Sequence, residues 1–110
     1  METLKNSRDF RRVIEDGNRE ILETITVYRL PNQTTETRIG ISVTKKVGGS
    51  VERNRIKRRI REAARKNAAL LPPGEDIVFV ARRNMASAGY AEVERDIRRS
   101  GGERRKEGVD

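Results

Sequence analysis

The sequence of 110 residues contains no cysteine, no histidine and no tryptophan. Without cysteine, the chain can form neither disulfides nor thiolate metal sites. Without histidine, it lacks the commonest general base and metal ligand. It also shows no clustered carboxylate motif of the kind that hydrolytic sites use. We therefore expect this chain to contain no catalytic residue and no protein-bound metal.

Aromatic residues and long apolar runs are also scarce. Two Phe and two Tyr are the only aromatic residues, and 34% of the residues are hydrophobic against 38% charged. No run approaches the roughly 20 residues of a membrane span, and the N-terminal residues show no apolar stretch typical of a signal peptide. For a chain of this length we expect one small cytoplasmic domain with a small core.

The basic charge is concentrated in one stretch, Lys45 to Lys66. This stretch contains ten Lys or Arg and two Glu, so its balance equals the net charge of +8 of the whole chain. The remaining residues carry equal numbers of basic and acidic side chains. Such a concentration indicates a polyanionic partner more strongly than a high isoelectric point alone.

The same stretch has the pattern of an amphipathic helix. Gly48 and Gly49 interrupt the chain before it, Ser50 is expected to be the N-cap, and Pro72 stops the helix. Successive helical residues are about 100° apart, so the cations fall mostly outside one face. That face is predicted to lie on the core, and its members are Ile56, Ile60, Ala63, Ala64, Asn67 and Leu71.

A solvated charged face is the alternative explanation of this run. Solvated helices usually mix the two signs at spacings that allow pairing, whereas residues 53–66 contain eight cations and one anion. Six of these cations are Arg, whose guanidinium group forms bidentate contacts with phosphate. We therefore favour a surface that binds a polyanion, on a single α/β domain over residues 1–100 with residues 101–110 as a flexible tail.

Three segments predict strands. Residues 20–30 and 38–46 alternate in polarity and suit an antiparallel pair, whereas the continuous apolar run 77–81 is typical of a central strand. One face of the pair would be apolar and covered by the basic helix. The other face carries Tyr28, and it is either exposed to solvent or a shallow groove for single-stranded nucleic acid.

Two further helices complete the expected fold. The first covers residues 6–17, with Asn6 or Ser7 as its cap, and the last covers residues 90–100. The predicted order is α-β-β-α-β-α. This order indicates an α+β fold, a two-layer α/β sandwich in which helices pack on a small, mostly antiparallel sheet.

The sequence also resembles the protein subunit of bacterial ribonuclease P, over roughly residues 4–100. Phe10, Tyr28 and the segment that leads into residues 77–81 contribute to the similarity. Its most specific part is the signature Lys45-Lys46-x-Gly48, followed by Val51-x-Arg53-Asn54-Arg55-x-Lys57-Arg58-x-x-Arg61-Glu62.

The resemblance implies a ribosomal protein S5 domain 2-like fold with a left-handed β-α-β crossover, although parallel strands are generally joined by right-handed connections. It also implies an RNA-binding subunit of an endoribonuclease whose catalyst is its RNA. This holoenzyme removes the 5′ leader from precursor tRNA, with Mg²⁺ held by the RNA and none expected on the protein alone. The implied partners are ribonuclease P RNA, bound by one protein per RNA, and precursor tRNA, with no membrane.

Two sets of site residues follow from the resemblance. Phe10, Ile14 and Tyr28 would line a cleft for the single-stranded leader, although Ile14 stands where an aromatic residue is common in the family. The residues expected to contact the catalytic RNA are Lys45, Lys46, Arg53, Asn54, Arg55, Lys57, Arg58, Arg61 and Arg65.

Three other functions remain open at this point. A ribosomal or other structural RNA-binding protein would share the size and the basic helix without a role in cleavage. A DNA-binding module would place residues 45–66 in a major groove, but only Asn54 is a clear candidate for reading bases. A self-contained nuclease would need catalytic carboxylates that the sequence does not indicate.

Overall fold

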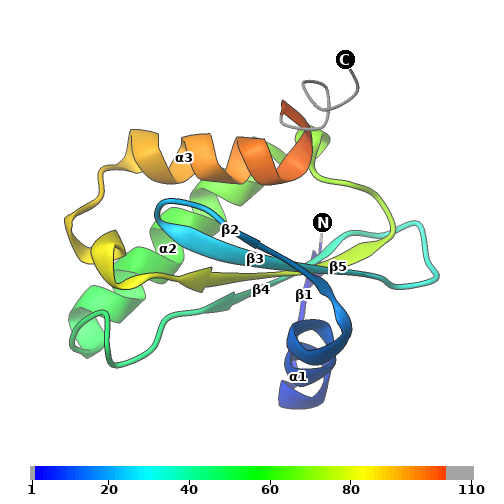
Figure 1. Cartoon of the computed structure of the whole chain (residues 1–110), viewed down its shortest axis with the longest axis horizontal. Helices are drawn as coiled ribbons and strands as arrows, with labels where there is room; N and C mark the ends of the chain where they lie inside the picture. The colour runs from blue at the N-terminus through cyan, green and yellow to red at the C-terminus, as the bar shows by residue number, and fades with distance from the viewer. Residues whose placement is uncertain (1, 104–110) are drawn as a thin grey trace.

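The structure of the chain is a computed structural model that describes residues 2–103. Figure 1 shows a twisted sheet with helices α2 and α3 on one side and α1 on the other. The elements in chain order are β1 (Glu2–Thr3), α1 (Ser7–Asp16), β2 (Asn18–Ile21), β3 (Ile25–Pro31), β4 (Arg38–Ser42), α2 (Ser50–Lys66), η1 (Ala68–Leu70), β5 (Glu75–Ala81), η2 (Arg83–Ser87), α3 (Tyr90–Arg98) and η3 (Arg99–Glu103). The predicted α+β class is confirmed, and β1 and β2 are additional to the predicted elements.

The five strands form one sheet in the order β1-β4-β5-β3-β2. β5 is antiparallel to β3 over seven residue pairs and parallel to β4 over five. β2 pairs with β3 in the antiparallel sense over four residue pairs, and β1 pairs with β4 in the parallel sense over two. The sheet is therefore mostly antiparallel, and α2 connects the parallel strands β4 and β5 in the predicted β-α-β order.

The predicted direct pairing of residues 20–30 with residues 38–46 is wrong, because β5 lies between β3 and β4. The physical reason is that Ile77, Val78 and Phe79 are all buried. A strand that is apolar on both faces gains most in the middle of a sheet, where helices cover both sides. The predicted central position of this strand is confirmed.

The segment 20–30, predicted as one strand, instead forms the hairpin of β2 and β3. The chain turns at residues 22–24, where Thr24 is buried. The backbone N–H and the hydroxyl of Thr24 both donate to Oδ2 of Asp96 in α3, at 2.7 and 2.6 Å. This turn contains no Gly or Pro that would have predicted it, and a contact with a distant helix holds it in place.

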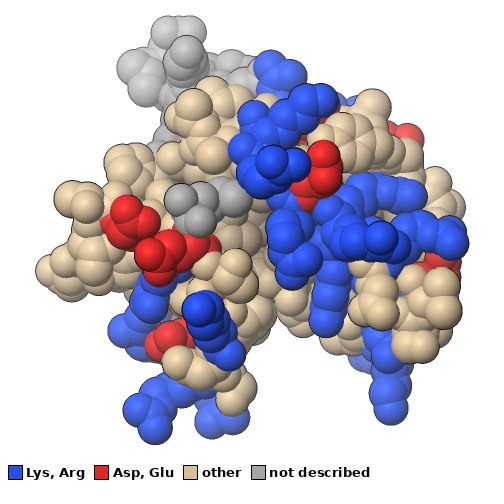
Figure 2. Space-filling view, turned by 180° about the vertical axis from the view of Figure 1, so that it is seen from behind, with Lys and Arg blue, Asp and Glu red and all other residues tan. Residues whose placement is uncertain are grey.

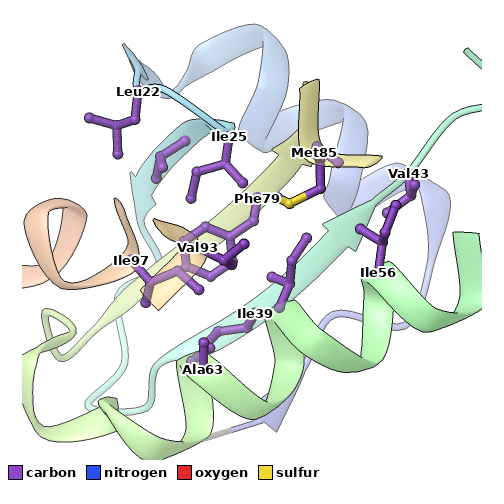
Figure 3. Close-up of a cluster of buried hydrophobic side chains, with 14 of the residues drawn as sticks. Leu22, Ile25, Ile39, Val43, Ile56, Ala63, Phe79, Met85, Val93 and Ile97 are labelled. Carbon is purple, nitrogen blue, oxygen red and sulfur yellow. The ribbon is translucent and has the colours of Figure 1, made fainter. Parts of the chain in front are cut away.

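The larger core lies between the sheet and the pair of helices α2 and α3. Figure 3 shows Phe79 of β5 between Ile56 and Ala63 of α2 and Val93 and Ile97 of α3. The stripe predicted to face the core is confirmed. Its four members within α2 are buried, and they are Ile56, Ile60, Ala63 and Ala64. Of the two that follow the helix, Leu71 is buried and Asn67 is half-buried.

The helix ends follow the predictions in one case and not in the other. Asn6 caps α1 as expected, and its Oδ1 accepts a hydrogen bond from the N–H of Asp9 at 2.8 Å. The prediction for Ser50 is wrong, because Gly49 is the N-cap of α2 and no side chain caps this helix. Ser50 is already helical, so its hydroxyl comes one position too late for the capping bond.

The last described residues remain packed against the domain. η3 continues from α3, and Gly101 is buried against η1, where an added Cβ would lie 2.6 Å from the carbonyl oxygen of Leu70. Most of the predicted tail, residues 104–110, lies outside the described residues.

α1 covers the second face of the sheet and forms a smaller core there. Val13 and Val78 are fully buried in it, and Phe10 and Tyr28 pack against them. The ring of Phe10 lies on Gly40 of β4, because a Cβ at Gly40 would be 2.5 Å from Cζ of Phe10. A glycine at this position therefore allows the aromatic ring to approach the sheet backbone closely.

A buried carboxylate fixes the other side of α1 to the sheet. Asp76 of β5 has no exposed side-chain surface, and Arg38 of β4 donates to it from Nε at 2.8 Å and from Nη2 at 2.6 Å. Arg12 of α1 donates at 3.1 Å and Asn32 at 2.9 Å. Burial alone would raise the pKa of Asp76, but the hydrogen bonds from Arg38 and Asn32 and the nearby guanidinium charges lower it overall.

We predict that Asp76→Asn lowers the free energy of unfolding at neutral pH by about 2–3 kcal/mol, because two guanidinium groups lose their carboxylate, although both are partly exposed. The lowered folded pKa means that the contribution of Asp76 is complete above its unfolded pKa of about 4 and is lost as the pH falls through the folded value. Urea unfolding at several pH values should therefore show the difference between the two proteins shrinking below about pH 4.

The matched control is Asp16→Asn, which makes the same chemical change at an exposed carboxylate, at the end of α1. If the difference in the free energy of unfolding between Asp76→Asn and the unchanged protein stays constant down to the lowest pH, the carboxylate of Asp76 does not have the lowered pKa.

Candidate nucleic-acid interface

The outer surface of α2 is cationic along three lines. Arg53, Lys57 and Arg61 follow at intervals of four residues on the flank near the β4 edge, and Arg61 lines a small hollow with Glu2 and Thr3 of β1. Figure 2 shows this side of the molecule, with Lys and Arg gathered in a broad area that contains few acidic residues. The crest of the helix carries Asn54, Arg58 and Arg65, and the flank near α3 carries Arg55, Arg59 and Lys66.

Few of these charges are neutralised within the described part of the chain. Arg55 pairs with Glu52 at 3.1 Å, and Arg65 pairs with Glu62 at 3.4 Å. Both pairs are well exposed, and ion pairs of this kind add little stability and exchange readily with other partners. The remaining predicted RNA contacts on the helix and its approach have no hydrogen bond or ion pair from their side chains to described residues: Lys45, Lys46, Asn54, Lys57, Arg58 and Arg61.

Three cations of α2 have a structural contact. Arg53 donates to the carbonyl oxygen of Gly48 at 3.0 Å, which steadies the approach to the helix. Arg59, which the signature did not single out, donates to the carbonyl oxygen of Ala88 at 3.0 Å and so links α2 to the segment before α3. The Nζ of Lys66 lies 5.8 Å from the ring centre of Tyr90, within the range of a cation–π contact.

Lys45 and Lys46 lie in the loop between β4 and α2. Both are exposed, and the turn is closed by a 3.0 Å hydrogen bond from the N–H of Val47 to the carbonyl oxygen of Thr44. Since β4 and β5 are parallel neighbours, this loop and the residues after β5 leave the sheet at the same end. The loop therefore extends the cationic surface of α2 toward the rim of the sheet.

The three residues predicted for the leader cleft all lie on the opposite face of the sheet, with α1. Phe10 and Tyr28 are half-buried, and Ile14 is 38% exposed. Phe10 contributes to the smaller core as well as to the surface, because its ring packs on Gly40. The structure thus brings these three residues together and separates them from α2 by the thickness of the sheet.

Beside α1 a strip of the sheet remains open, on the face for which the sequence allowed either solvent exposure or a shallow groove. The register aligns Ser42 of β4, Val80 of β5, Thr26 of β3 and Ile21 of β2 in one row across four strands. Ser42, Val80 and Thr26 are half-buried, and Ile21 is exposed. We call this row the shelf. Finding it required the strand order, because neighbouring members come from segments far apart in the chain.

Other kinds of site find no support in the described residues. Within residues 2–103, no three Asp or Glu side chains are grouped closely enough to hold a metal ion. Among the same residues, no helix has the length and apolar character needed to cross a bilayer.

Fold and surface together define a small, strongly basic α+β domain with a cationic helix on one side of the sheet and a partly apolar shelf on the other. The family model that matches the chain is that of ribonuclease P, over residues 1–102. The chain belongs to the ribonuclease P protein family.

Relatives and solved structures agree with this assignment. The ribonuclease P protein component of Clostridioides difficile is 40% identical over 96 residues, which cover 86% of this chain and 84% of the relative. The component of Streptococcus pneumoniae is 37% identical over 94 residues, covering 86% and 76%. The structure of the RNase P protein of Staphylococcus aureus superposes with a TM-score of 0.78 and 30% sequence identity, and the match covers 86% of this chain and 87% of that one. The structure of the RNase P protein of Thermotoga maritima superposes with a TM-score of 0.78 and 28% sequence identity, and the match covers 90% of this chain and 97% of that one.

Proposed function

We propose that this chain is the RNA-binding subunit of a ribonuclease P holoenzyme, an endoribonuclease that gives tRNA its mature 5′ end. The observation that supports this most directly is the outer surface of α2, where exposed cations face solvent with few carboxylates among them. A helix packed firmly on a core holds these charges at fixed positions, and fixed guanidinium groups suit the phosphates of a folded RNA.

The proposed contacts to ribonuclease P RNA are those of the signature helix and its approach. Arg58 and Arg61 are exposed and without partners among the described residues, so they are available for phosphates. Lys57 and Arg53 are half-buried on the flank of α2 near β4. They would contact RNA that lies against this side of the helix. We expect one protein to bind one RNA through this surface.

The proposed place of the precursor tRNA leader, the predicted leader cleft, is the surface formed by α1 and the shelf. Tyr28 offers an aromatic ring, and Phe10 and Ile14 add apolar surface beside it. Single-stranded nucleic acid is bound in this way, by stacking of bases on exposed side chains next to cations that hold the backbone. Ile14 would offer the leader an aliphatic contact instead of a ring for stacking.

Catalysis is proposed to occur in the RNA partner, in the cytoplasm, with Mg²⁺ held by that RNA. The protein would act electrostatically: its cations stabilise the folded RNA and hold the leader, and they thereby reduce the concentration of Mg²⁺ that the RNA needs. Since the chain belongs to the ribonuclease P family, a ribosomal or DNA-binding role is a less economical explanation of the same surface.

Reconstitution with a bacterial ribonuclease P RNA tests this function as a whole. At a Mg²⁺ concentration too low for the RNA alone, the added protein should restore cleavage of precursor tRNA at the mature 5′ end. The protein without RNA should not cleave the same substrate. Cleavage by the protein alone, or no effect of the protein on the RNA, would contradict the proposal.

A charge reversal tests the helix. Arg58→Glu should weaken binding to ribonuclease P RNA by roughly tenfold or more at low salt and lower the slope of log affinity against log salt by about 1 or more, because a phosphate contact is lost. Arg8→Glu is the matched control, since it makes the same charge change on exposed α1, on the other face of the sheet. If both variants weaken RNA binding equally, α2 is not the part of the protein that contacts the RNA.

The leader cleft is tested by comparing two substrates. Tyr28→Ala should weaken binding of precursor tRNA to the holoenzyme by roughly five- to a hundredfold, the range of one stacking contact, and leave binding of mature tRNA unchanged. Tyr28→Phe keeps the ring and should bind both like the original protein. If Tyr28→Ala affects both substrates equally, the ring does not contact the leader.

A further inference from the structure

Large apolar side chains that remain exposed in the described residues are few. They are Ile14 at 38%, Ile21 at 57% and Val51 at 72% exposure. Val51 lies in the first turn of α2, on the surface proposed for ribonuclease P RNA. Ile14 and Ile21 lie on the other face of the sheet. Ile14 is one of the three predicted leader contacts, whereas Ile21 ends the shelf on the outermost strand and has no role yet.

The path of α1 shows where Ile14 and Ile21 lie relative to each other. α1 crosses the strands, from Phe10 above Gly40 of β4 to Gly17, where a Cβ would come within 2.7 Å of the carbonyl oxygen of Arg29 in β3. Asp9 and Arg12 occupy the flank of α1 that meets Arg38 and Asp76, at the beginning of β4 and β5. Phe10 and Ile14, spaced by four residues, occupy the opposite flank, toward the ends of these strands and hence toward the shelf.

β2 continues the shelf beyond the end of α1. Ile21 stands opposite Thr26, and Arg19 stands opposite Tyr28. Residues two apart in a strand point to the same face, so Ile21 and Arg19 both lie on the face that carries Tyr28. Arg19 is exposed, and its side chain has no hydrogen bond or ion pair to described residues. The outermost strand thus presents an apolar side chain and a free cation side by side.

We propose that Arg19 and Ile21 of β2 form an outer subsite of the shelf for one further nucleotide of a single-stranded RNA, with Ile21 against the base and Arg19 at the phosphate. This inference rests on the proposed leader cleft and extends it by one strand. The row from Ser42 to Ile21 spans three strand spacings, about 14 Å, which gives an extended single strand room for a path along α1.

The chemistry of the pair favours an unpaired nucleotide over other ligands. An apolar side chain contacts the face of any base without reading its sequence, and a neighbouring guanidinium group holds the backbone. Inside a duplex both faces of each base are covered by its neighbours, so only an unpaired, unstacked base can place a face against Ile21. The aliphatic contact at Ile21 also adds to the exposed apolar surface that Ile14 provides.

The test uses the reconstituted holoenzyme and precursor tRNAs whose leaders are lengthened one nucleotide at a time. Ile21→Thr keeps the β-branched side chain and removes apolar surface, so it should weaken binding about three- to tenfold. This loss should begin only once the leader is long enough to reach β2. Ile21→Phe should tighten binding over the same leader lengths, and Arg19→Gln should lower the salt slope by about 1 for long leaders only.

Asn18→Ala is the matched control, because Asn18 is exposed on the same strand and points to the other face of the sheet. Thermal unfolding of each variant shows whether the domain is intact. If Tyr28→Ala weakens leader binding while Ile21→Thr and Arg19→Gln do not at any length, the outer subsite is wrong and the leader cleft stands. If none of the three variants depends on the leader, the cleft itself is wrong.

Discussion

Burial of the apolar stripe of α2 against the sheet is the interaction on which the other features depend. Like charges on one helix repel each other, and they do so most strongly when no polyanion is bound. Ile56 and Ile60 are almost fully covered by the core around Phe79, and this contact keeps the helix in place despite that repulsion. Burial of this stripe therefore allows α2 to carry mostly positive charges. Without it, repulsion between the cations would favour unfolding of the helix.

The buried carboxylate of Asp76 has the corresponding role on the other face. It holds Arg38 of β4 and Arg12 of α1 at once, so it fixes α1 across the central strands. The position of α1 in turn leaves the shelf open, because Phe10 can lie only where Gly40 allows its ring to approach. The contacts of Asp76 under one flank of α1 thus help to determine that the shelf beside the opposite flank stays open.

The sequence predicted those features that depend on local pattern. The core-facing stripe of α2, the cap at Asn6 and the central place of the run 77–81 follow from spacing and composition, and the structure has all of them. Features that depend on distant contacts were not predictable in this way. The turn at Thr24 is held by Asp96 from α3, and the buried Asp76 is held by Arg38 and Arg12, which are distant from it in the chain.

The same limit applies to the candidate site. A linear motif identified the cationic helix, because its residues are neighbours in the chain, whereas the shelf joins four strands and becomes visible only in their register. The two surfaces lie on opposite faces of one thin sheet, and Lys45 and Lys46 lie in the loop that leads from the sheet to α2. If RNA occupies both faces, a sheet held by the core on one side and Asp76 on the other sets a fixed distance between them. In that case the rigidity of the domain, as well as its charge, determines where a leader lies relative to a bound RNA.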